Sequence, residues 1–479
     1  MLVRLLALLG PFGVYAALGL ILWGLWQERQ KLDWRALVPA VAGLVASLLL
    51  VPSAHRLFFD EDIYIGIAQN LSRAPVYQTT VYGAPGDVVA SSYYKEPPGW
   101  PALASLAMIA AGRRESVVFW LSRLLFAAAI ASVYHLASRV VQSRWQALFA
   151  AIFFGSAPVA LWSSASAGTD APAALLSTIG LWGLVTGNGA LAAGGLGMAS
   201  LTRMELVVLT PLIWLNSGIE KQWKLTSAGI AAIAFSHIAW VLSVTSQLSQ
   251  AERTEAPFSL SHAGENLLGN VQFLVNPYSF AAIATALAVV AGIQARKRKL
   301  QVPLVLPIIA LFTVYCLFYA GSFHVNPRYS IQLLAPLAVL GASVLRPRYA
   351  IVLVMLLLPY LAPAPVSNGI DMFAEDHAAV VEFSALRKPD DLIVSAEHDV
   401  FLNQGARVMN TRFASEHPDV LRSELGHRRV LYYPGIRVGA DESEDTQADR
   451  WIRESFVLTP IMFKEIRGRT AIVFLVQTR

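Results

Sequence analysis

The chain has 479 residues, of which 55% are hydrophobic and 14% are charged, whereas an ordinary soluble domain is about 25% charged. This composition excludes a soluble protein as the whole molecule and predicts an integral membrane protein. The net charge is +5, but the basic residues stand in short loops between apolar runs and form no patch with interleaved aromatics, so we predict no nucleic-acid partner.

The charges divide the chain into two parts. Residues 370–479 contain 18 of the 32 acidic and 14 of the 37 basic side chains, a net charge of −4, and the first 369 residues carry +9. We therefore predict a mainly α-helical transmembrane domain over 1–365 and a small soluble α/β domain over 366–479. The single cysteine, Cys316, excludes an intrachain disulfide and a cysteine metal site.

Apolar segments that could cross about 30 Å of hydrocarbon recur through the first domain. The first segment lacks a small-residue cleavage site, which indicates an uncleaved span rather than a signal peptide. We predict a polytopic bundle of about 10–13 spans, short or re-entrant helices included. The candidate spans are 5–26, 36–52, 117–138, 146–163, 171–187, 225–245, 278–294, 303–320, 329–345 and 349–362.

Two further apolar stretches fit a span less well. Residues 100–112 would reach only about 20 Å as a helix, which favours an interfacial or re-entrant element. Residues 190–215 contain three glycines over 194–197 and then Arg203 and Glu205. They resemble a broken pair of half-helices, which a membrane protein tolerates where the backbone lines protein or a wet cavity.

The short basic loops predict the orientation. If 53–116 is a large external loop, the positive-inside rule places the basic loops in the cytoplasm. These loops are 27–35, 139–145, 216–224, 295–302 and 346–348. The C-terminal domain and the candidate chemistry then face the periplasm of a bacterial inner membrane. In the alternative topology 100–112 spans and 190–215 crosses once, which moves Asp170 to the other side.

The C-terminal part alternates strand-like and helix-compatible runs, which predicts the α/β domain. Residues 441–449, DESEDTQAD, are predicted to form a solvated loop. The strand-like runs begin at 391, 406, 429 and 471.

Three consecutive acidic residues, Asp60, Glu61 and Asp62, directly follow the second span. One interpretation is a helix N-terminus, where carboxylates cap the helix and favour its dipole. The other is a general base or a metal-binding carboxylate, because clustered carboxylates shift one another's pKa. A divalent metal ion at this cluster is the one cofactor that the sequence suggests.

About 35 residues later, 93-YYKEPPGWP places Lys95 and Glu96 among aromatics and prolines. Alone, this stretch is typical of an interfacial anchor.

The order of motifs, however, resembles the C-type glycosyltransferases that use polyprenyl-phosphate sugars, such as protein O-mannosyltransferases and the lipid A aminoarabinose transferase. The matching residues are Asp60-Glu61, Tyr64, Ile67-Ala68, Lys95, Pro97-Pro98, Thr169-Asp170-Ala171-Pro172 and Arg328-Tyr329. Since Glu96 separates Lys95 from the prolines, either residue could take the family's lysine position.

This resemblance implies that Asp60 is the general base and that Glu61 tunes it or binds the acceptor. Cations must stabilise the lipid phosphate that leaves, and the candidates are Lys95, Arg203 and Arg328. For Arg203 the plainer alternative is an ion pair with Glu205, and for Arg328 it is an interfacial arginine. The other candidates for the active site are Asp62, Tyr64, Glu96, Asp170, Glu205, His324 and Tyr329. Asp170 could simply cap a helix, and His324 could be structural.

The function implied by the resemblance is inverting transfer of a sugar from a polyprenyl-phosphate donor to an envelope lipid, glycan or protein. The alternative is an envelope lipid transporter or flippase, with Arg203 and Glu205 in a midplane site. Internal hydropathy symmetry would favour the transporter, and the sequence shows none.

Overall fold

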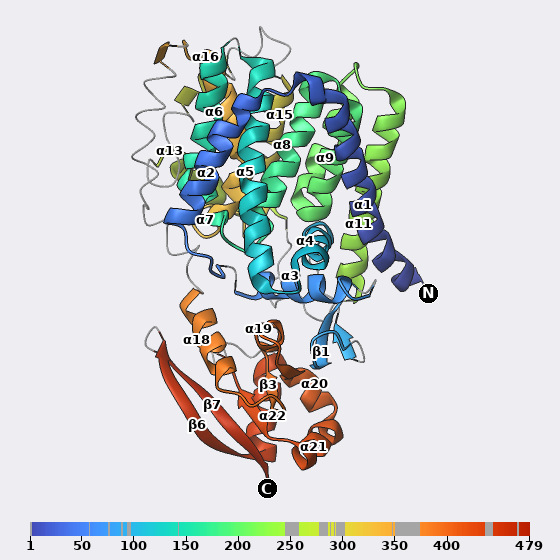
Figure 1. Ribbon diagram of the computed structural model, residues 1–479, viewed down its shortest axis with the longest axis vertical. Coiled ribbons are helices and arrows are strands. Elements are labelled where there is room, and N and C mark those ends of the chain that lie inside the picture. The colour runs from blue at the N-terminus through green and yellow to red at the C-terminus, as the bar shows by residue number, and fades with distance from the viewer. Residues whose placement is uncertain are drawn as a thin grey trace.

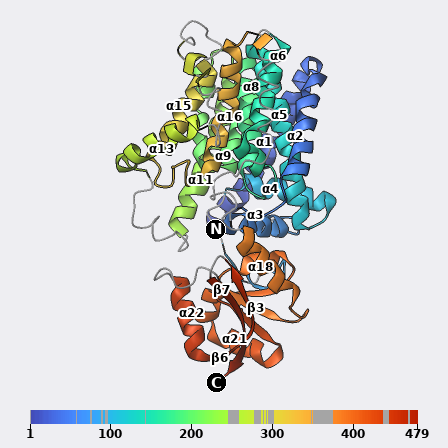
Figure 2. The same cartoon turned by 90° about the vertical axis from the view of Figure 1, so that its left-hand side faces the viewer.

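The computed structural model has a helical bundle stacked on a smaller sheet domain along the long axis of the molecule (Figure 1). Figure 2 shows the same two layers from the side. The structure describes residues 2–56, 58–74, 77–87, 90–92, 97–141, 143–244, 258–276, 302–346, 374–435, 444–466 and 469–479, with a few positions in 286–293 and 348–349. Lys95 and Glu96 therefore lie outside the described residues, as do most of the predicted spans 278–294 and 349–362.

The remaining predicted spans coincide with helices of the bundle. The long helices are α1 (Leu2–Glu28), α2 (Leu37–Leu50), α5 (Glu115–Val140), α6 (Arg144–Ser156), α8 (Asp170–Thr186), α9 (Gly189–Thr202), α11 (Lys221–Val244), α13 (Ala263–Val275), α15 (Val302–Leu317) and α16 (Ile331–Val344). Short helices α7 (Pro158–Ser163) and α10 (Leu212–Leu215) and 3₁₀ turns η1 (Arg29–Lys31), η2 (Trp34–Ala36), η3 (Met204–Leu209), η4 (Leu260–His262) and η6 (Pro327–Ser330) connect them.

Within the described residues, two helical stretches are long and apolar enough to cross a membrane, Leu9–Lys31 and Glu115–Val140. Shorter apolar helices surround them, and the total number of spans stays a prediction. Large apolar side chains point outward from the bundle, among them Leu22, Val41 and Leu124. Such an apolar outer surface suits contact with lipid rather than with water.

The glycines of α9 pack helices together instead of breaking the chain. The helix continues through Gly194, Gly195 and Gly197, so the break predicted within 190–215 does not lie at the glycines. A Cβ at Gly195 would collide with the backbone of Gly180 in α8, because the two helices approach each other closely. The break comes at Arg203, whose extended backbone (φ −140°, ψ 121°) ends the helix.

Two short helices close the end of the bundle that faces the sheet domain. These are α3 (Phe58–Leu71) and α4 (Gly99–Ala111), and α4 lies across the bundle rather than along it (Figure 1). This position fits the interfacial or re-entrant element predicted for 100–112. Gly112, with φ +99°, ends α4.

At the opposite end, loops that the sequence assigns to one side come together. Arg139 donates a hydrogen bond to Glu28 at 3.3 Å, and Gln146 donates one to the backbone carbonyl of Leu345 at 2.5 Å. Exposed tryptophans border these loops, and the guanidinium of Arg29 lies 3.8 Å from the ring centre of Trp26. Tryptophans beside cations are typical of the headgroup level of a membrane.

The sheet has seven strands in the order β2-β1-β4-β3-β5-β7-β6. The four strands predicted in the C-terminal part are confirmed, and β3, β4 and β5 pair in parallel. The hairpin β1–β2 comes from the large loop of the first domain and adds to β4 in antiparallel register, with Tyr82 opposite Met409. The strands are β1 (Thr79–Gly83), β2 (Ala90–Ser92), β3 (Leu392–Ser395), β4 (Arg407–Asn410), β5 (Val430–Tyr433), β6 (Phe456–Ile466) and β7 (Arg469–Thr478).

The helices of the sheet domain are α18 (Ala374–Ala385), α19 (His398–Asn403), α20 (Thr411–Glu416), α21 (Pro418–His427) and α22 (Glu444–Ser455). The loop predicted over 441–449 is wrong from residue 444 onward, because α22 begins there. Its apolar face buries Ala448 and Ile452 against the sheet, and Asp449 accepts a hydrogen bond from Tyr432. Both α18 and α19 lie at the face that meets α3 (Figure 1).

Candidate active site

Asp60 and Arg328 form an ion pair between two parts of the chain that are far apart in sequence. Asp60 lies in the first turn of α3 and Arg328 lies in η6. The two terminal nitrogens of Arg328 donate to one carboxylate oxygen of Asp60 at 3.3 and 3.2 Å. The Asp60 side chain is 35% exposed and that of Arg328 is 18% exposed. The pair is therefore partly exposed to solvent.

Arg203 holds two carboxylates at the break after α9. Its guanidinium pairs with Asp170 at the start of α8 and with Glu205 in η3, the latter at 2.5 Å. Arg203 and Asp170 are buried. The helix ends at Arg203, and the extended backbone of this residue directs its side chain to Asp170. A buried arginine requires such partners, and two carboxylates supply them.

Tyr329 connects the two arginines. Its ring centre lies 4.9 Å from the guanidinium carbon of Arg203 and 5.5 Å from that of Arg328. The ring of Tyr315 stacks on that of Tyr329 with centres 5.1 Å apart, and Tyr315 donates a hydrogen bond to Glu205 at 3.2 Å. We call this group the arginine cluster. Its members are Asp60, Asp170, Arg203, Glu205, Tyr315, Arg328 and Tyr329.

The arginine cluster unites six of the residues chosen from the sequence, and Tyr315 is the member that the sequence did not indicate. Tyr315 stands in an apolar helix with no motif around it. Two other candidates lie elsewhere. Tyr64 is buried in an apolar core with Trp100 and Ala104, and His324 is exposed, with its ring packed edge-on against Phe273.

Asp170 lies in the same cluster as Arg203 and close to the pair of Asp60 and Arg328. The alternative topology would place Asp170 at the end of the bundle opposite Asp60. The structure contradicts that alternative, because the contact between Arg203 and Asp170 fixes Asp170 at the end that faces the sheet domain.

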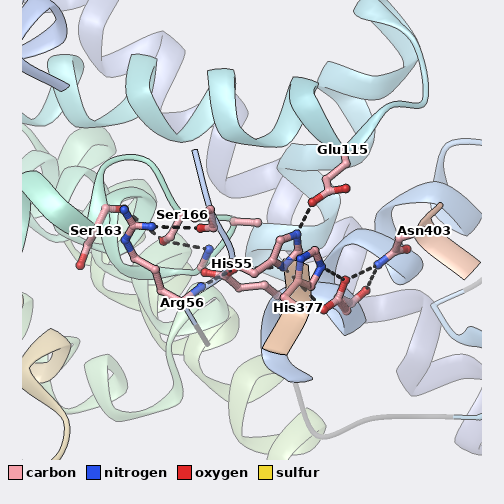
Figure 3. Close-up of polar contacts among 12 residues, drawn as sticks. His55, Arg56, Glu115, Ser163, Ser166, His377 and Asn403 are labelled. Atoms are coloured by element: carbon pink, nitrogen blue, oxygen red, sulfur yellow. Dashed lines mark hydrogen bonds and ion pairs between the residues drawn. The ribbon is translucent and has the colours of Figure 1, made fainter. Parts of the chain in front are cut away.

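Glu61 and Asp62 turn away from Asp60 and enter a second group, which we call the histidine cluster. Its members are His55, Glu61, Asp62, Glu115 and His377. The Nδ1 atom of His55 lies 3.2 Å from Glu61 and 3.5 Å from Asp62, and its Nε2 atom contacts Glu115. Figure 3 shows His55 between Glu115 on one side and His377 on the other.

The histidine cluster also joins the two layers of the molecule. His377 comes from α18 and stacks on His55, with ring centres 3.6 Å apart. Asn403 of α19 donates to the side chain of Asp62 at 2.9 Å, and Gln404 donates to Glu115 at 2.8 Å. The sheet domain therefore docks on the bundle through polar side chains as well as through the shared sheet.

Burial changes the proton affinity of this cluster. Burial alone would lower the pKa of His55, but the carboxylates of Asp62, Glu115 and Glu61 raise it to about 9. Burial also raises the pKa of Glu61 to about 7, against the opposing effect of His55 and Arg56. The pKa of Asp62 is lowered, because His55 and His377 outweigh its burial. Near neutral pH the cluster thus compensates its negative charge by binding protons.

The three consecutive carboxylates do not converge on one point. Asp60 contacts Arg328, whereas Glu61 and Asp62 contact His55. The group that could hold a metal ion is instead His55, Glu115 and His377, whose ligand atoms all lie within 4.8 Å of one another. None of these three residues was chosen from the sequence, because each stands alone in its own segment.

Neither a family model nor a curated protein matches this sequence. Solved structures share its fold. ArnT from Cupriavidus metallidurans, crystallised with undecaprenyl phosphate, gives a TM-score of 0.59 at 13% identity over 91% of this chain and 97% of its own. An oligosaccharyltransferase of Archaeoglobus fulgidus in complex with zinc and sulfate gives 0.51 at 13% identity, over 90% of this chain and 72% of its own.

This is the fold of the C-type glycosyltransferases. The resemblance that the sequence motifs predicted is therefore confirmed at the level of the fold. The apo form of the same ArnT gives a TM-score of 0.56, again over 91% of this chain. Within this C-type fold, the arginine cluster combines a partly exposed carboxylate with two arginines. Such a site can accept a proton and bind an anion.

Proposed function

We propose that the chain transfers a sugar from a polyprenyl-phosphate donor to a cell-envelope acceptor. The observation that carries this proposal is the pairing of Asp60 with Arg328 beside Arg203. A carboxylate that accepts a proton and guanidinium groups that bind phosphate are the two components that this transfer requires. The shared fold of ArnT, which was crystallised with undecaprenyl phosphate, supports the choice of donor.

In the proposed reaction Asp60 removes the proton from an acceptor hydroxyl. The hydroxyl oxygen forms a bond to the anomeric carbon as the bond from that carbon to the phosphate oxygen breaks. Direct displacement inverts the anomeric centre. The polyprenyl phosphate leaves with one additional negative charge, and Arg328, Arg203 and Lys95 are the cations assigned to stabilise it.

Donor binding would also prepare the base. In the structure Arg328 donates to Asp60, and its buried Nε–H makes no hydrogen bond within the described residues. A lipid phosphate offers a planar guanidinium a better acceptor set than one carboxylate oxygen does. The phosphate would therefore take Arg328 and release Asp60 to meet the acceptor.

The other acidic residues receive different roles. Asp170 and Glu205 hold Arg203 in place, so we assign them to positioning. Glu61 and Asp62 belong to the histidine cluster and anchor the first turn of α3, which carries Asp60. A divalent ion shared by Asp60, Glu61 and Asp62 would require these side chains to turn toward one another, and the proposed reaction has no step through it.

The proposed location is a bacterial inner membrane with the arginine cluster on the periplasmic side. The basic loops and exposed tryptophans at the other end of the bundle support this orientation. A reporter fused after residue 299 should be cytoplasmic, and reporters fused after 90, 168 or 479 should be periplasmic. A cytoplasmic signal after residue 168 would contradict the proposal.

The function is tested in a strain that lacks the gene. Mass spectrometry of its lipids should show an accumulated polyprenyl-phosphate sugar, and the wild-type protein should remove it. The purified protein in nanodiscs should then convert that lipid to free polyprenyl phosphate when an acceptor is supplied. If the lipid instead moved across the membrane unchanged, the protein would be a transporter.

A further inference from the structure

We propose that His55, Glu115 and His377 bind one divalent transition-metal ion of the Zn²⁺ type, which fastens the sheet domain to the helical bundle. The three residues come from the loop before α3, the first residue of α5 and helix α18. The site is separate from the arginine cluster, and the proposal does not depend on the proposed transferase activity.

The donor set suits such an ion. Zn²⁺ prefers imidazole nitrogens and carboxylate oxygens at about 2.0–2.2 Å, so two ligand atoms on one ion lie at most about 4 Å apart. The ligand atoms here all lie within 4.8 Å of one another. For one ion to bind both imidazoles, the stacked rings of His55 and His377, whose centres lie 3.6 Å apart, must also turn so that one nitrogen of each points at the ion. Three protein ligands leave a fourth position for water or for a neighbouring carboxylate.

The surroundings of His55 match the usual environment of a metal ligand. A ligating histidine normally donates a hydrogen bond from its second ring nitrogen to a carboxylate, and this bond fixes the tautomer. In His55, Nε2 faces Glu115 and Nδ1 lies 3.2 Å from Glu61 and 3.5 Å from Asp62. Asp62 in turn accepts a hydrogen bond from Asn403 at 2.9 Å. A second layer of contacts is thus already in place around the proposed ligands.

Buried polar atoms in the cluster still lack hydrogen bonds. His55 is 2% exposed and His377 is 7% exposed, and within the described residues Nε2 of His377 makes no hydrogen bond, its nearest carboxylate oxygen being that of Asp62 at 3.5 Å. Such atoms are rare in folded proteins and call for a ligand. The Glu115 side chain is 20% exposed, which gives an ion a route to the site.

The charges of the cluster also favour a cation. Glu61, Asp62 and Glu115 can each carry a negative charge, and Arg56 beside Glu61 is the fixed positive charge that faces them. Neutral imidazoles, the form that binds metal, leave two negative charges uncompensated when all three carboxylates are ionised. One divalent ion supplies that charge. The ion would hold α18 to α5 and so join the two layers.

The first test measures metal in the full-length protein, purified in detergent without chelators. Inductively coupled plasma mass spectrometry should find about one zinc or similar ion per chain. Dialysis against EDTA should lower the thermal unfolding midpoint, and added Zn²⁺ should restore it. Co²⁺ in place of Zn²⁺ should give the visible absorption bands of a low-coordinate nitrogen and oxygen site.

The second test uses matched variants. Glu115→Gln and His377→Gln keep the approximate shape but remove a ligand. Changes to residues that only contact a metal ligand already lower metal affinity by about 10- to 100-fold, so each variant should lose at least that much. His398→Gln is the control, because His398 is buried in the same domain but lies outside the cluster. It should bind Zn²⁺ as the wild type does.

The proposal would be overturned if folded wild-type protein bound no stoichiometric ion and melted at the same temperature with EDTA and with Zn²⁺. It would also be overturned if both ligand variants retained wild-type affinity. If a variant failed to fold, the metal content and cobalt spectrum of the wild type would still decide the matter.

Discussion

The arginine cluster and the histidine cluster differ in exposure although they share three consecutive residues of the chain. Asp60 belongs to the first cluster and remains 35% exposed beside Arg328. Glu61 and Asp62 belong to the second and are at most 1% exposed beside His55. The first cluster is partly exposed to solvent, whereas the second is buried and joins the two layers of the molecule.

Helix geometry explains how neighbours reach different clusters. Successive residues of an α-helix point about 100° apart, and in the first turn of α3 Asp60 points to Arg328 whereas Glu61 and Asp62 both reach His55. A run of acidic residues at a helix start therefore does not by itself define one site. In this chain it serves two sites on two sides of α3.

The largest effect that we expect from a single substitution is the loss of catalysis on changing Asp60. Asp60→Asn should lower the rate of transfer by about 10²- to 10⁴-fold, the usual contribution of a general base. Glu61→Gln, in the other cluster, should lower it far less. The measurement is turnover of the lipid-linked donor by purified protein of matched monodispersity. Equal losses for the two variants would mean that the acid run acts as one unit.

Arg328 gives the next largest effect. Arg328→Ala should weaken binding of a polyprenyl-phosphate analogue by roughly 30- to 1000-fold, or about 2–4 kcal/mol, because a bidentate contact is lost at a partly desolvated site. Arg328→Lys should recover only part, since an ammonium cannot reproduce the planar fork. Titration in nanodiscs measures both variants. Unchanged affinity in both would reduce Arg328 to a structural partner of Asp60.

The histidine cluster should respond to pH when metal is removed. The pKa of His55, raised from 6.5 to about 9, stabilises the folded protein fully below about pH 6.5, and this stability is lost as the pH rises through about 9. The pKa of Glu61, raised to about 7, also favours the folded protein at low pH, and this contribution to stability is lost as the pH rises through about 7. In EDTA the unfolding midpoint should therefore fall with rising pH. His55→Gln should flatten that slope, and a parallel slope would contradict the assignment.

The smallest predicted effect concerns docking. Asn403→Ala removes two hydrogen bonds to Asp62, one to its backbone carbonyl at 3.0 Å and one to its side chain at 2.9 Å. The cost should be about 1–2 kcal/mol of stability, with little loss of donor binding. Chemical denaturation in detergent measures the first quantity and titration the second. A large loss of donor binding would show that the two clusters are coupled.

Local sequence patterns were sufficient for much of the fold. Apolar length located most helices, and strand-like runs located four of the five strands of the C-terminal part, β3, β4, β5 and β7, whereas β6 was missed. The hairpin β1–β2 was missed because its strands depend on pairing with β4, about 325 residues away in the chain. The helix α22 was missed because only Ala448 and Ile452 mark its buried face among acidic residues.

The two clusters also differ in whether local sequence patterns could predict them. The arginine cluster could be predicted because each member except Tyr315 stands in a motif or is a charge in an apolar segment, where an unpaired charge is costly. The histidine cluster could not be predicted. His55 and His377 are isolated in the sequence, and only the docking of α18 on α3 brings them together.

The most direct test of the central claim is a structure of the protein in nanodiscs with added undecaprenyl phosphate. We predict that the phosphate lies within about 3 Å of the guanidinium of Arg328 and near that of Arg203, with the Asp60 carboxylate released from Arg328. A phosphate bound away from the arginine cluster, with the pair of Asp60 and Arg328 intact, would contradict the account.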